Sequence, residues 1–298
     1  MSTLSKQRIT LLFTTLMALL LANAVHADEE RFQRLAVIGA SASAGFGVTE
    51  EIRISETESR VEGISLGDVL IESGRQSEIV ILDLASDAFF MNPRKFGEET
   101  VQRVVAWKPD LVVGVDFLFW YVYGNSNHDN DPDVEIEKRL KGLEEGLRML
   151  EKVNAPLVIG EVSDMTPAIG RMLSKKQVPS PAAIEKVNQR IHAWAQERPE
   201  VVVIPLHELI ERISRGEPFT IGEHAWNQEE REELLNSDKL HPNLQGLVAI
   251  TQSINAELID NEQLKERMQT MEMDREILVA RIRGTDTAKP EEATSTTP

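Results

Sequence analysis

A serine in a small-residue loop and an aspartate–histidine pair near the far end of the chain are the residues best suited to chemistry. Ser41 lies in Gly39-Ala40-Ser41-Ala42-Ser43-Ala44-Gly45, directly after an apolar run, and the pair lies in Asp238-Lys239-Leu240-His241-Pro242. A serine hydroxyl becomes an effective nucleophile when an imidazole accepts its proton, and a carboxylate on the other ring nitrogen fixes the tautomer and stabilises the imidazolium. These residue types predict acyl transfer through a Ser-His-Asp triad.

Each signal is weak when it stands alone. A Gly/Ala/Ser loop after a strand is often only a tight turn or a phosphate-binding loop. Here both nucleotide-binding patterns fail, because Gly-x-Gly-x-x-Gly is absent and no lysine follows Gly45. An aspartate three residues before a histidine is also common in purely structural loops. Ser43, the second hydroxyl of the loop, is interpreted as a hydrogen-bonding residue of the loop itself.

Taken together, the two segments resemble the first and last sequence blocks of the SGNH (GDSL-like) hydrolase family, over roughly Arg34 to Ile254. The resemblance implies a flavodoxin-like three-layer α/β/α sandwich with a central parallel sheet. It also implies that Ser41 is the nucleophile, His241 the general base and acid, and Asp238 the residue that orients His241. The substrate expected from it is a carbohydrate acetyl ester or a lipid ester, and we expect neither a cofactor nor a metal.

Two positions depart from the family pattern for the oxyanion hole, which combines the serine N–H, a glycine N–H after the second strand and an asparagine after the third. The segment Asp83–Ala88 contains no glycine, so we expect the N–H of Ala88 to substitute, with Ser86 and Asp87 as alternatives. After the third strand, Asp116 occupies the asparagine position in Gly114-Val115-Asp116-Phe117.

The Asp116 substitution leaves three outcomes open. An ionised carboxylate donates no hydrogen bond, and losing one oxyanion donor typically costs about 10²–10³ in rate. Burial can hold Asp116 protonated so that it donates an O–H, or an amide from Asn125 or Asn127 can replace it. Otherwise the site binds without hydrolysing. On the oxyanion-facing interpretation, Asp116→Asn should raise the rate at neutral pH.

Three functions therefore fit the sequence. The first is an SGNH-type esterase, the second is an O-acyltransferase that uses the same triad, and the third is a non-catalytic binding or scaffold protein of the cell envelope. Retention of Ser41, Asp238 and His241 favours the enzymes, whereas Asp116 favours the third.

Short β-branched apolar runs alternate with amphipathic segments, a pattern typical of a parallel sheet covered by helices. The predicted strands are Leu35–Ile38, Ile79–Leu84, Leu111–Val115, Leu157–Ile159 and Val201–Ile204. Three predicted helices begin at a capping residue followed by proline, and a fourth follows His241-Pro242. They run from Asn92 to Trp107, from Asp131 to Val153, from Ser180 to Ala195, and over Gly246–Ile259.

The N-terminal segment predicts export. Lys6 and Arg8 precede the apolar run Ile9–Ala22, and Val25-His26-Ala27 has small residues at the positions that a signal peptidase reads. We therefore expect a signal peptide over residues 1–27, a periplasmic or secreted hydrolase-like domain over 28–257, and no transmembrane segment in the mature form.

The C-terminal segment has a different composition. We expect a helix over residues 258–283, in which five apolar residues recur at heptad-like spacing, followed by a disordered tail over 284–298. Self-association through this helix and packing on the domain's own surface both fit the stripe, which comprises Leu264, Met268, Met271, Leu278 and Ile282.

Composition excludes several partners and chemistries. The formal net charge of −17 disfavours binding to nucleic acid, and the absence of cysteine excludes disulfides and thiolate chemistry. Asp129, Asp131 and Asp133 have a calcium-like spacing but lack the glycine and distal glutamate of an EF-hand loop, so helix capping explains Asp131 better. The aromatic run Phe117–Tyr123 fits equally a substrate pocket and a loop packed on the body.

Overall fold

The computed structural model describes residues 31–286 except 78, 125–130, 223 and 227–233. The predicted signal peptide, Asn125, Asn127 and residues 287–298 of the predicted tail lie outside this part of the chain. No helix among the described residues is long and apolar enough to cross a bilayer.

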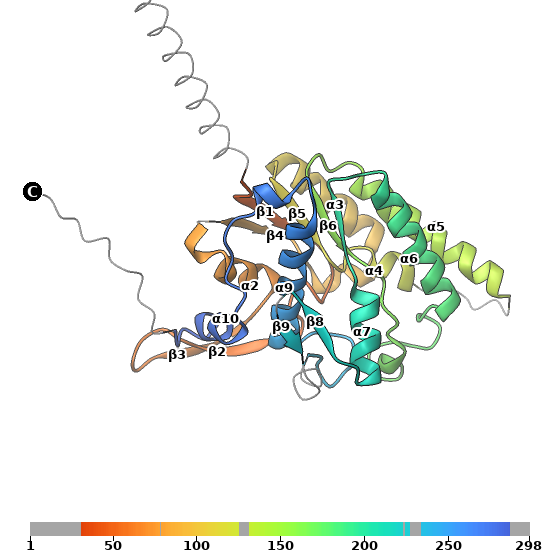
Figure 1. Ribbon diagram of the computed structural model, residues 1–298. Helices are drawn as coiled ribbons and strands as arrows, with labels where there is room; N and C mark the ends of the chain where they lie inside the picture. The colour runs from red at the N-terminus through yellow and green to blue at the C-terminus, as the bar shows by residue number, and fades with distance from the viewer. Residues whose placement is uncertain (1–30, 78, 125–130, 223, 227–233, 287–298) are drawn as a thin grey trace, which may run out of the picture.

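A five-stranded parallel sheet forms the centre of the molecule (Figure 1). In space the order is β4-β1-β5-β6-β7, which is the 2-1-3-4-5 order of flavodoxin-like folds. All five predicted strands are confirmed, and no end differs from its prediction by more than one residue. Their bounds are Arg34–Val37 (β1), Val80–Asp83 (β4), Leu111–Gly114 (β5), Leu157–Gly160 (β6) and Val201–Ile204 (β7).

Helices cover both faces of the sheet, which confirms the predicted three-layer arrangement (Figure 1). One layer contains α3, α4, α5 and α6, and the other contains α2, α9 and α10. Their bounds are Leu66–Ser73 (α2), Pro93–Trp107 (α3), Phe119–Tyr123 (α4), Pro132–Leu150 (α5), Pro181–Gln196 (α6), Leu244–Asp260 (α9) and Arg275–Ile282 (α10).

The helix starts follow local chemistry. The side chains of Asn92, Asp131 and Ser180 each accept a hydrogen bond from a first-turn N–H, and a proline follows each of them at the first helical position. These predicted N-caps are confirmed. The last predicted helix, α9, begins two residues earlier than expected, because Asn243 caps it through the N–H of Gly246.

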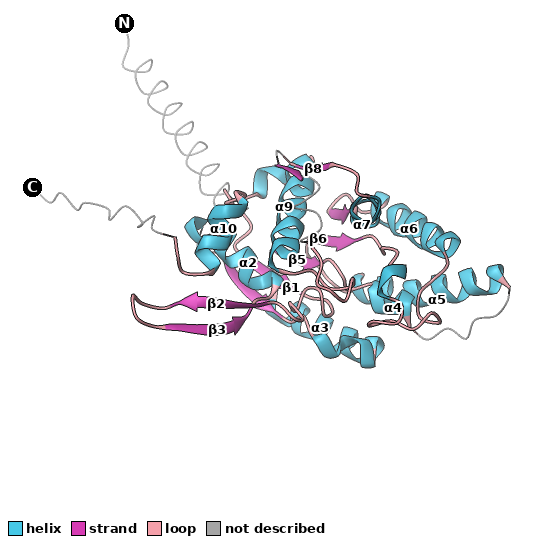
Figure 2. Cartoon of the chain, turned by 90° about the horizontal axis from the view of Figure 1, so that it is seen from below, coloured by secondary structure: helices cyan, strands magenta, loops and turns pink. Residues whose placement is uncertain are grey.

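Several elements were not predicted. The hairpin of β2 (Thr49–Arg53) and β3 (Ser59–Gly63) lies beside α10 (Figures 1 and 2), where the N–H of Arg53 donates to the carbonyl of Arg283. Its mostly polar, exposed sequence lacks an apolar alternation. The other unpredicted elements are the helices α2, α4 and α7 (Leu206–Arg215), the strands β8 (Phe219–Ile221) and β9 (His224–Trp226), and the 3₁₀ turns Arg75–Ser77, Asp87–Met91, Thr166–Ala168 and Lys265–Arg267.

The C-terminal segment corrects one expectation. Residues 258–283 do not form a single helix, because α9 ends at Asp260 and α10 begins only at Arg275. The apolar stripe nevertheless packs within the chain. Leu278 is fully buried, Leu264 and Ile282 are nearly so, and Met268 and Met271 pack against the same core. The stripe therefore packs against the domain itself, as the second interpretation expected. Its apolar residues are already covered within one chain, without self-association.

Candidate active site

The nucleophile loop follows β1 at the carboxyl edge of the sheet. Residues 40–46 form a tight helical turn in which the carbonyls of Ala40 and Ser41 accept hydrogen bonds from the N–H groups of Ala44 and Phe46, both at 2.9 Å. The neighbouring strand β5 carries Asp116 just beyond its end. Strand order reverses between β1 and β5, which is where open α/β sheets place their ligand sites.

The histidine loop is shaped by its own aspartate. Asp238 Oδ1 accepts the N–H groups of Leu240 (2.9 Å) and His241 (3.0 Å), and Lys239 between them has φ +59°, a left-handed conformation that is uncommon for a side-chain-bearing residue. The N–H of Asn236 closes the loop on the carbonyl of His241 at 2.9 Å. This turn leaves Asp238 Oδ2 facing the imidazole.

The structure brings the three predicted triad residues into one hydrogen-bonded series. Asp238 Oδ2 lies 2.8 Å from His241 Nδ1, and His241 Nε2 lies 2.9 Å from Ser41 Oγ, across 200 positions of sequence. With Nδ1–H donating to the carboxylate, Nε2 is the acceptor for the serine hydroxyl. The ring is 3% exposed and packs against Phe46 with ring centroids 4.6 Å apart. An imidazole held in this way can accept the Ser41 proton without reorienting.

The charge on Asp238 is maintained by these contacts. Partial burial would by itself raise the pKa of Asp238, but the hydrogen bonds from the His241 N–H, the His241 ring and the Leu240 N–H outweigh it and lower the pKa below its ordinary value. Asp238 is therefore ionised at neutral pH, as a residue that stabilises an imidazolium must be.

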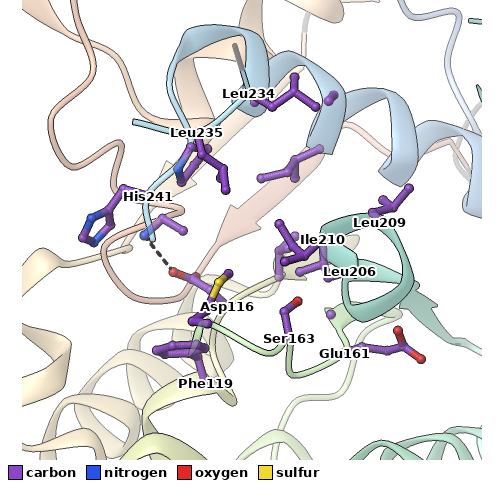
Figure 3. Close-up of a pocket in the computed structure, with 18 of the residues that line it drawn as sticks. Asp116, Phe119, Glu161, Ser163, Leu206, Leu209, Ile210, Leu234, Leu235 and His241 are labelled. Atoms are coloured by element: carbon purple, nitrogen blue, oxygen red, sulfur yellow. Dashed lines mark hydrogen bonds between the residues drawn. The ribbon is translucent and has the colours of Figure 1, made fainter. Parts of the chain in front are cut away.

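Asp116 has a different arrangement from the one that the sequence suggested. Its Oδ1 accepts the Ala40 N–H (2.9 Å) and the Ser43 hydroxyl (2.6 Å), and its Oδ2 accepts the Ala42 (2.9 Å) and Ser43 (3.2 Å) N–H groups. Figure 3 draws one such bond as a dashed line at Asp116. Both oxygens act as acceptors for the nucleophile loop in this arrangement, and the role of Asp116 in the oxyanion hole stays a prediction.

The close contact between Asp116 and the nucleophile loop requires a glycine at position 39. Its φ is +147°, and a Cβ at this position would lie 2.1 Å from Asp116 Oδ1 and 2.9 Å from Ser43 Oγ. No other residue fits both the backbone conformation and the space. Ser43 is buried and bonded to Asp116, which confirms its predicted role as a hydrogen-bonding residue of the loop.

The segment after β4 also differs from expectation. The N–H of Ala88 donates to the Ser86 side chain at 3.3 Å, and the N–H of Ser86 donates to the Gly39 carbonyl at 3.1 Å. Ala88 is also absent from the wall of the pocket that contains Ser41. The predicted oxyanion donor at Ala88 is therefore already used within its own turn. Among the described residues, the N–H of Ser41 itself has no protein acceptor.

An apolar pocket of about 110 Å³ has Ser41 and His241 in its wall. Figure 3 shows His241 together with other residues that line it. Phe119 and Trp120 of the aromatic run line it, whereas Phe117, Tyr121 and Tyr123 are buried in the core. Both interpretations of that run are therefore partly correct. The sequence reasoning missed most of the wall, which α7 and α9 supply. The i, i+3, i+4, i+7 spacing of apolar residues over 206–213 is the signal that could have revealed α7.

Other polar groups near the sheet edge are engaged in structural contacts. His192 Nε2 lies 2.7 Å from Glu161 Oε1, and the His207 N–H donates to Glu161 Oε2 at 3.1 Å. Asp131 caps α5, as predicted. Within the part of the chain that the structure describes, no three His, Asp or Glu side chains are grouped so as to hold a metal ion.

Comparison with known proteins finds similarity in three dimensions only. No protein-family model and no curated protein sequence matches the chain. A catalytic mutant of an acetylxylan esterase from Geobacillus stearothermophilus has 11% identity and a TM-score of 0.47, covering 76% of this chain and 94% of that one. A GDSL-like lipase from Parabacteroides merdae has 13% identity and a TM-score of 0.47, covering 76% and 95%.

A third similar structure is the psychrotrophic esterase EstA from Pseudoalteromonas sp., with 12% identity and a TM-score of 0.44, covering 75% of this chain and 96% of that one. These structural neighbours are esterases and lipases, and the lipase is described as GDSL-like.

Proposed function

We propose that this chain is a serine hydrolase of the SGNH type that cleaves an ester and acts in the periplasm or outside the cell. The observation that carries the proposal is the hydrogen-bonded series from Asp238 through His241 to Ser41, at 2.8 Å and 2.9 Å, at the mouth of an apolar pocket. A nearly buried imidazole with a carboxylate on one nitrogen and a serine hydroxyl on the other matches the requirement for an activated nucleophile.

The reaction follows from this geometry. Ser41 Oγ attacks the ester carbonyl carbon while its proton passes to His241 Nε2, and the imidazolium is stabilised by Asp238. Collapse of the tetrahedral intermediate breaks the carbon–oxygen bond to the alcohol, which leaves with the proton from His241. Water then attacks the acyl-serine, gives a proton to His241, and the acid is released as that proton returns to Ser41 Oγ.

Stabilising the negatively charged oxygen of the tetrahedral intermediate is the most difficult requirement for this chain. The Ser41 N–H is available, whereas Asp116 and Ala88 are not donors to the pocket. Each well-placed donor contributes about 10²–10³ in rate, so we expect turnover below that of an enzyme with a complete oxyanion hole. The same deficiency favours a second candidate, a non-catalytic binding protein that retains the triad.

A fluorophosphonate probe separates the two candidates. The probe should label the wild-type protein between pH 4 and 8, and Ser41→Ala should abolish labelling. Short and long p-nitrophenyl esters measured in parallel report turnover. Ser43→Ala serves as the matched control, because Ser43 is the other hydroxyl of the same loop and bonds Asp116 rather than His241. Absence of labelling across this pH range would refute hydrolysis and leave the binding protein.

A further inference from the structure

The pocket beside the triad is bounded by two helices that present the same spacing to it. On α7 the wall is formed by Leu206, Leu209, Ile210 and Ile213, which recur at i, i+3, i+4 and i+7. None of these four residues is buried, although all lie on the apolar face of a strongly amphipathic helix. Figure 3 shows Leu206 and Ile210 directed toward the same space as Leu234 and Leu235. The apolar face of α7 therefore packs partly against the core and also borders the pocket.

The opposing helix α9 forms the other wall with Gly246, Ala249, Ile250 and Ser253, again at i, i+3, i+4 and i+7. His241 lies just before this helix, so the wall starts at the triad and leads away from it. The seven residue steps from Gly246 to Ser253, at about 1.5 Å each, make this wall about 10 Å long. Ala249 contributes only a methyl group to this wall, and Gly246 packs closely against Leu234 and Pro242, where a Cβ would lie 2.2 Å from the Leu234 carbonyl oxygen.

The two carboxylates in the wall are engaged within the protein. Asp116 is engaged with the nucleophile loop, and both oxygens of Glu161 are engaged by His192 and His207. Figure 3 shows Glu161 pointing away from the space between the leucines.

The wall also contains the hydroxyls of Ser163 and Ser253, of which Ser253 Oγ is buried with no hydrogen-bond partner among the described residues. A sugar has many hydroxyls and would find few partners in this largely apolar wall, so it would lose most of its hydrogen bonds to water without replacement, which is costly. A hydrocarbon chain would cover the exposed faces of Leu209 and Ile210 and gain from its own burial.

We infer that the pocket between α7 and α9 is an acyl-chain site, and that the substrate is an ester of an unbranched medium-chain acid and not an acetyl ester. This inference rests on the proposed function, because the triad places the ester carbonyl at Ser41 and the chain along α9. A zigzag hydrocarbon advances about 1.25 Å per bond of about 1.5 Å, so a wall of about 10 Å accommodates about eight carbons. The alcohol part of the ester stays outside the pocket, on the solvent side of Ser41.

The chain-length profile tests the inference through turnover. With p-nitrophenyl esters from acetate to dodecanoate, kcat/KM should peak near octanoate and exceed the acetate value by about 30-fold or more, since each buried methylene contributes about fourfold. A profile that is flat or highest at acetate would overturn the inference.

A filled pocket provides the structural test. Ala249→Phe should lower the octanoate-to-acetate ratio of kcat/KM at least tenfold, because the ring occupies the space between the helices. The matched control is Ala256→Phe, the same change on the same helix, facing the wider cavity beside Glu257 and not the acyl pocket. That variant should keep the ratio within twofold. Ile210→Phe repeats the test from α7 if Ala249→Phe does not fold. An unchanged ratio in the folded pocket variants would contradict the inference.

A binding measurement separates this inference from the proposed function. Ser41→Ala cannot form an acyl-enzyme, so calorimetry of this full-length variant with octanoate and acetate reports the pocket alone. Octanoate should bind at least 30-fold more tightly, and adding Ala249→Phe should remove the difference. Octanoate binding without hydrolysis by the wild type would refute the hydrolase and retain the acyl site. Equal binding of the two acids would refute the acyl site whether or not the wild type hydrolyses esters.

Discussion

Asp238 and Asp116 both lie near Ser41, but their carboxylates have different partners. Asp238 contacts the His241 ring, and Asp116 contacts the loop that carries Ser41. Asp238 belongs to a short loop whose own N–H groups occupy one oxygen and leave the other for the His241 ring. Asp116 meets a loop more than 70 residues distant in sequence, and three N–H groups and one hydroxyl of that loop occupy both of its oxygens. Asp238 can therefore stabilise charge on a reacting group, whereas Asp116 holds the backbone that carries the nucleophile. The role of a carboxylate is decided by the donors that surround it.

The largest expected effect separates the two aspartates by activity. Asp238→Asn should lower kcat by about 10³–10⁴, because an amide favours the wrong imidazole tautomer and does not stabilise the imidazolium. Stability should change little by comparison. Steady-state kinetics on the octanoate ester and the rate of fluorophosphonate labelling measure the loss. A decrease of less than tenfold would show that Asp238 does not orient His241 as proposed.

Asp116→Asn should act mainly on stability. Its amide nitrogen would face N–H groups that now have an acceptor, and an unsatisfied buried N–H costs about 1–3 kcal/mol. We expect the free energy of unfolding to fall by that amount and kcat to fall about tenfold as Ser41 loses its fixed position. This reverses the rate gain expected from the sequence. Denaturant unfolding and steady-state kinetics on the Asp116→Asn variant measure these two effects. A higher kcat at neutral pH would instead indicate that Asp116 faces the oxyanion.

Gly39→Ala tests the same contact between Asp116 and the loop after β1 by changing the loop instead of the carboxylate. The added methyl would lie 2.1 Å from Asp116 Oδ1 in a backbone conformation that favours glycine. We expect a loss of about 2–3 kcal/mol in the free energy of unfolding, combining backbone strain with the broken hydrogen bonds.

Gly170→Ala is the control for Gly39→Ala. Gly170 also has a positive φ, +78°, but no atom lies within 4 Å of its added Cβ, so only the conformational cost of about 1 kcal/mol should appear. Chemical denaturation of both variants provides the comparison. Equal losses would show that the contact with Asp116 does not matter.

The smallest expected effect is the pH dependence of stability contributed by Asp238. Because the folded-state pKa of Asp238 is lowered, its stabilising contribution is present above the unfolded-state pKa of about 3.9 and is lost as the pH falls through the folded-state pKa. The Tm difference between wild type and Asp238→Asn should therefore be constant from pH 5 to 7 and shrink below about pH 4. Thermal unfolding monitored by circular dichroism measures it. A difference that grows on acidification would contradict the sign of the shift.

Local patterns in the sequence determined much of the fold. The five short apolar runs became the five strands, and Asn92, Asp131 and Ser180 capped the helices that their proline neighbours predicted. The contact between Asp238 and His241 was also a local prediction, because three residues of a tight turn suffice to bring them together. Interactions within a few residues are governed by backbone geometry and capping chemistry, which sequence reports directly.

The family resemblance supplied the pairing of Ser41 with His241, which no local rule predicts across 200 positions. It could not show which donors surround Asp116, because an aligned position indicates where a side chain lies and not which groups contact it. The direction of that carboxylate depends on the packing of the loop after β1 against the loop after β5.

The acyl pocket was likewise decided by tertiary structure. Periodicity can show that residues 206–213 have an apolar face, but it cannot show whether that face meets a side chain or a cavity. The placement of α7 opposite α9, with the small side chain of Ala249 between them, leaves the space open beside Ser41. The residue types of the proposed triad could thus be predicted from the sequence, whereas the shape of the pocket beside them is set by long-range packing.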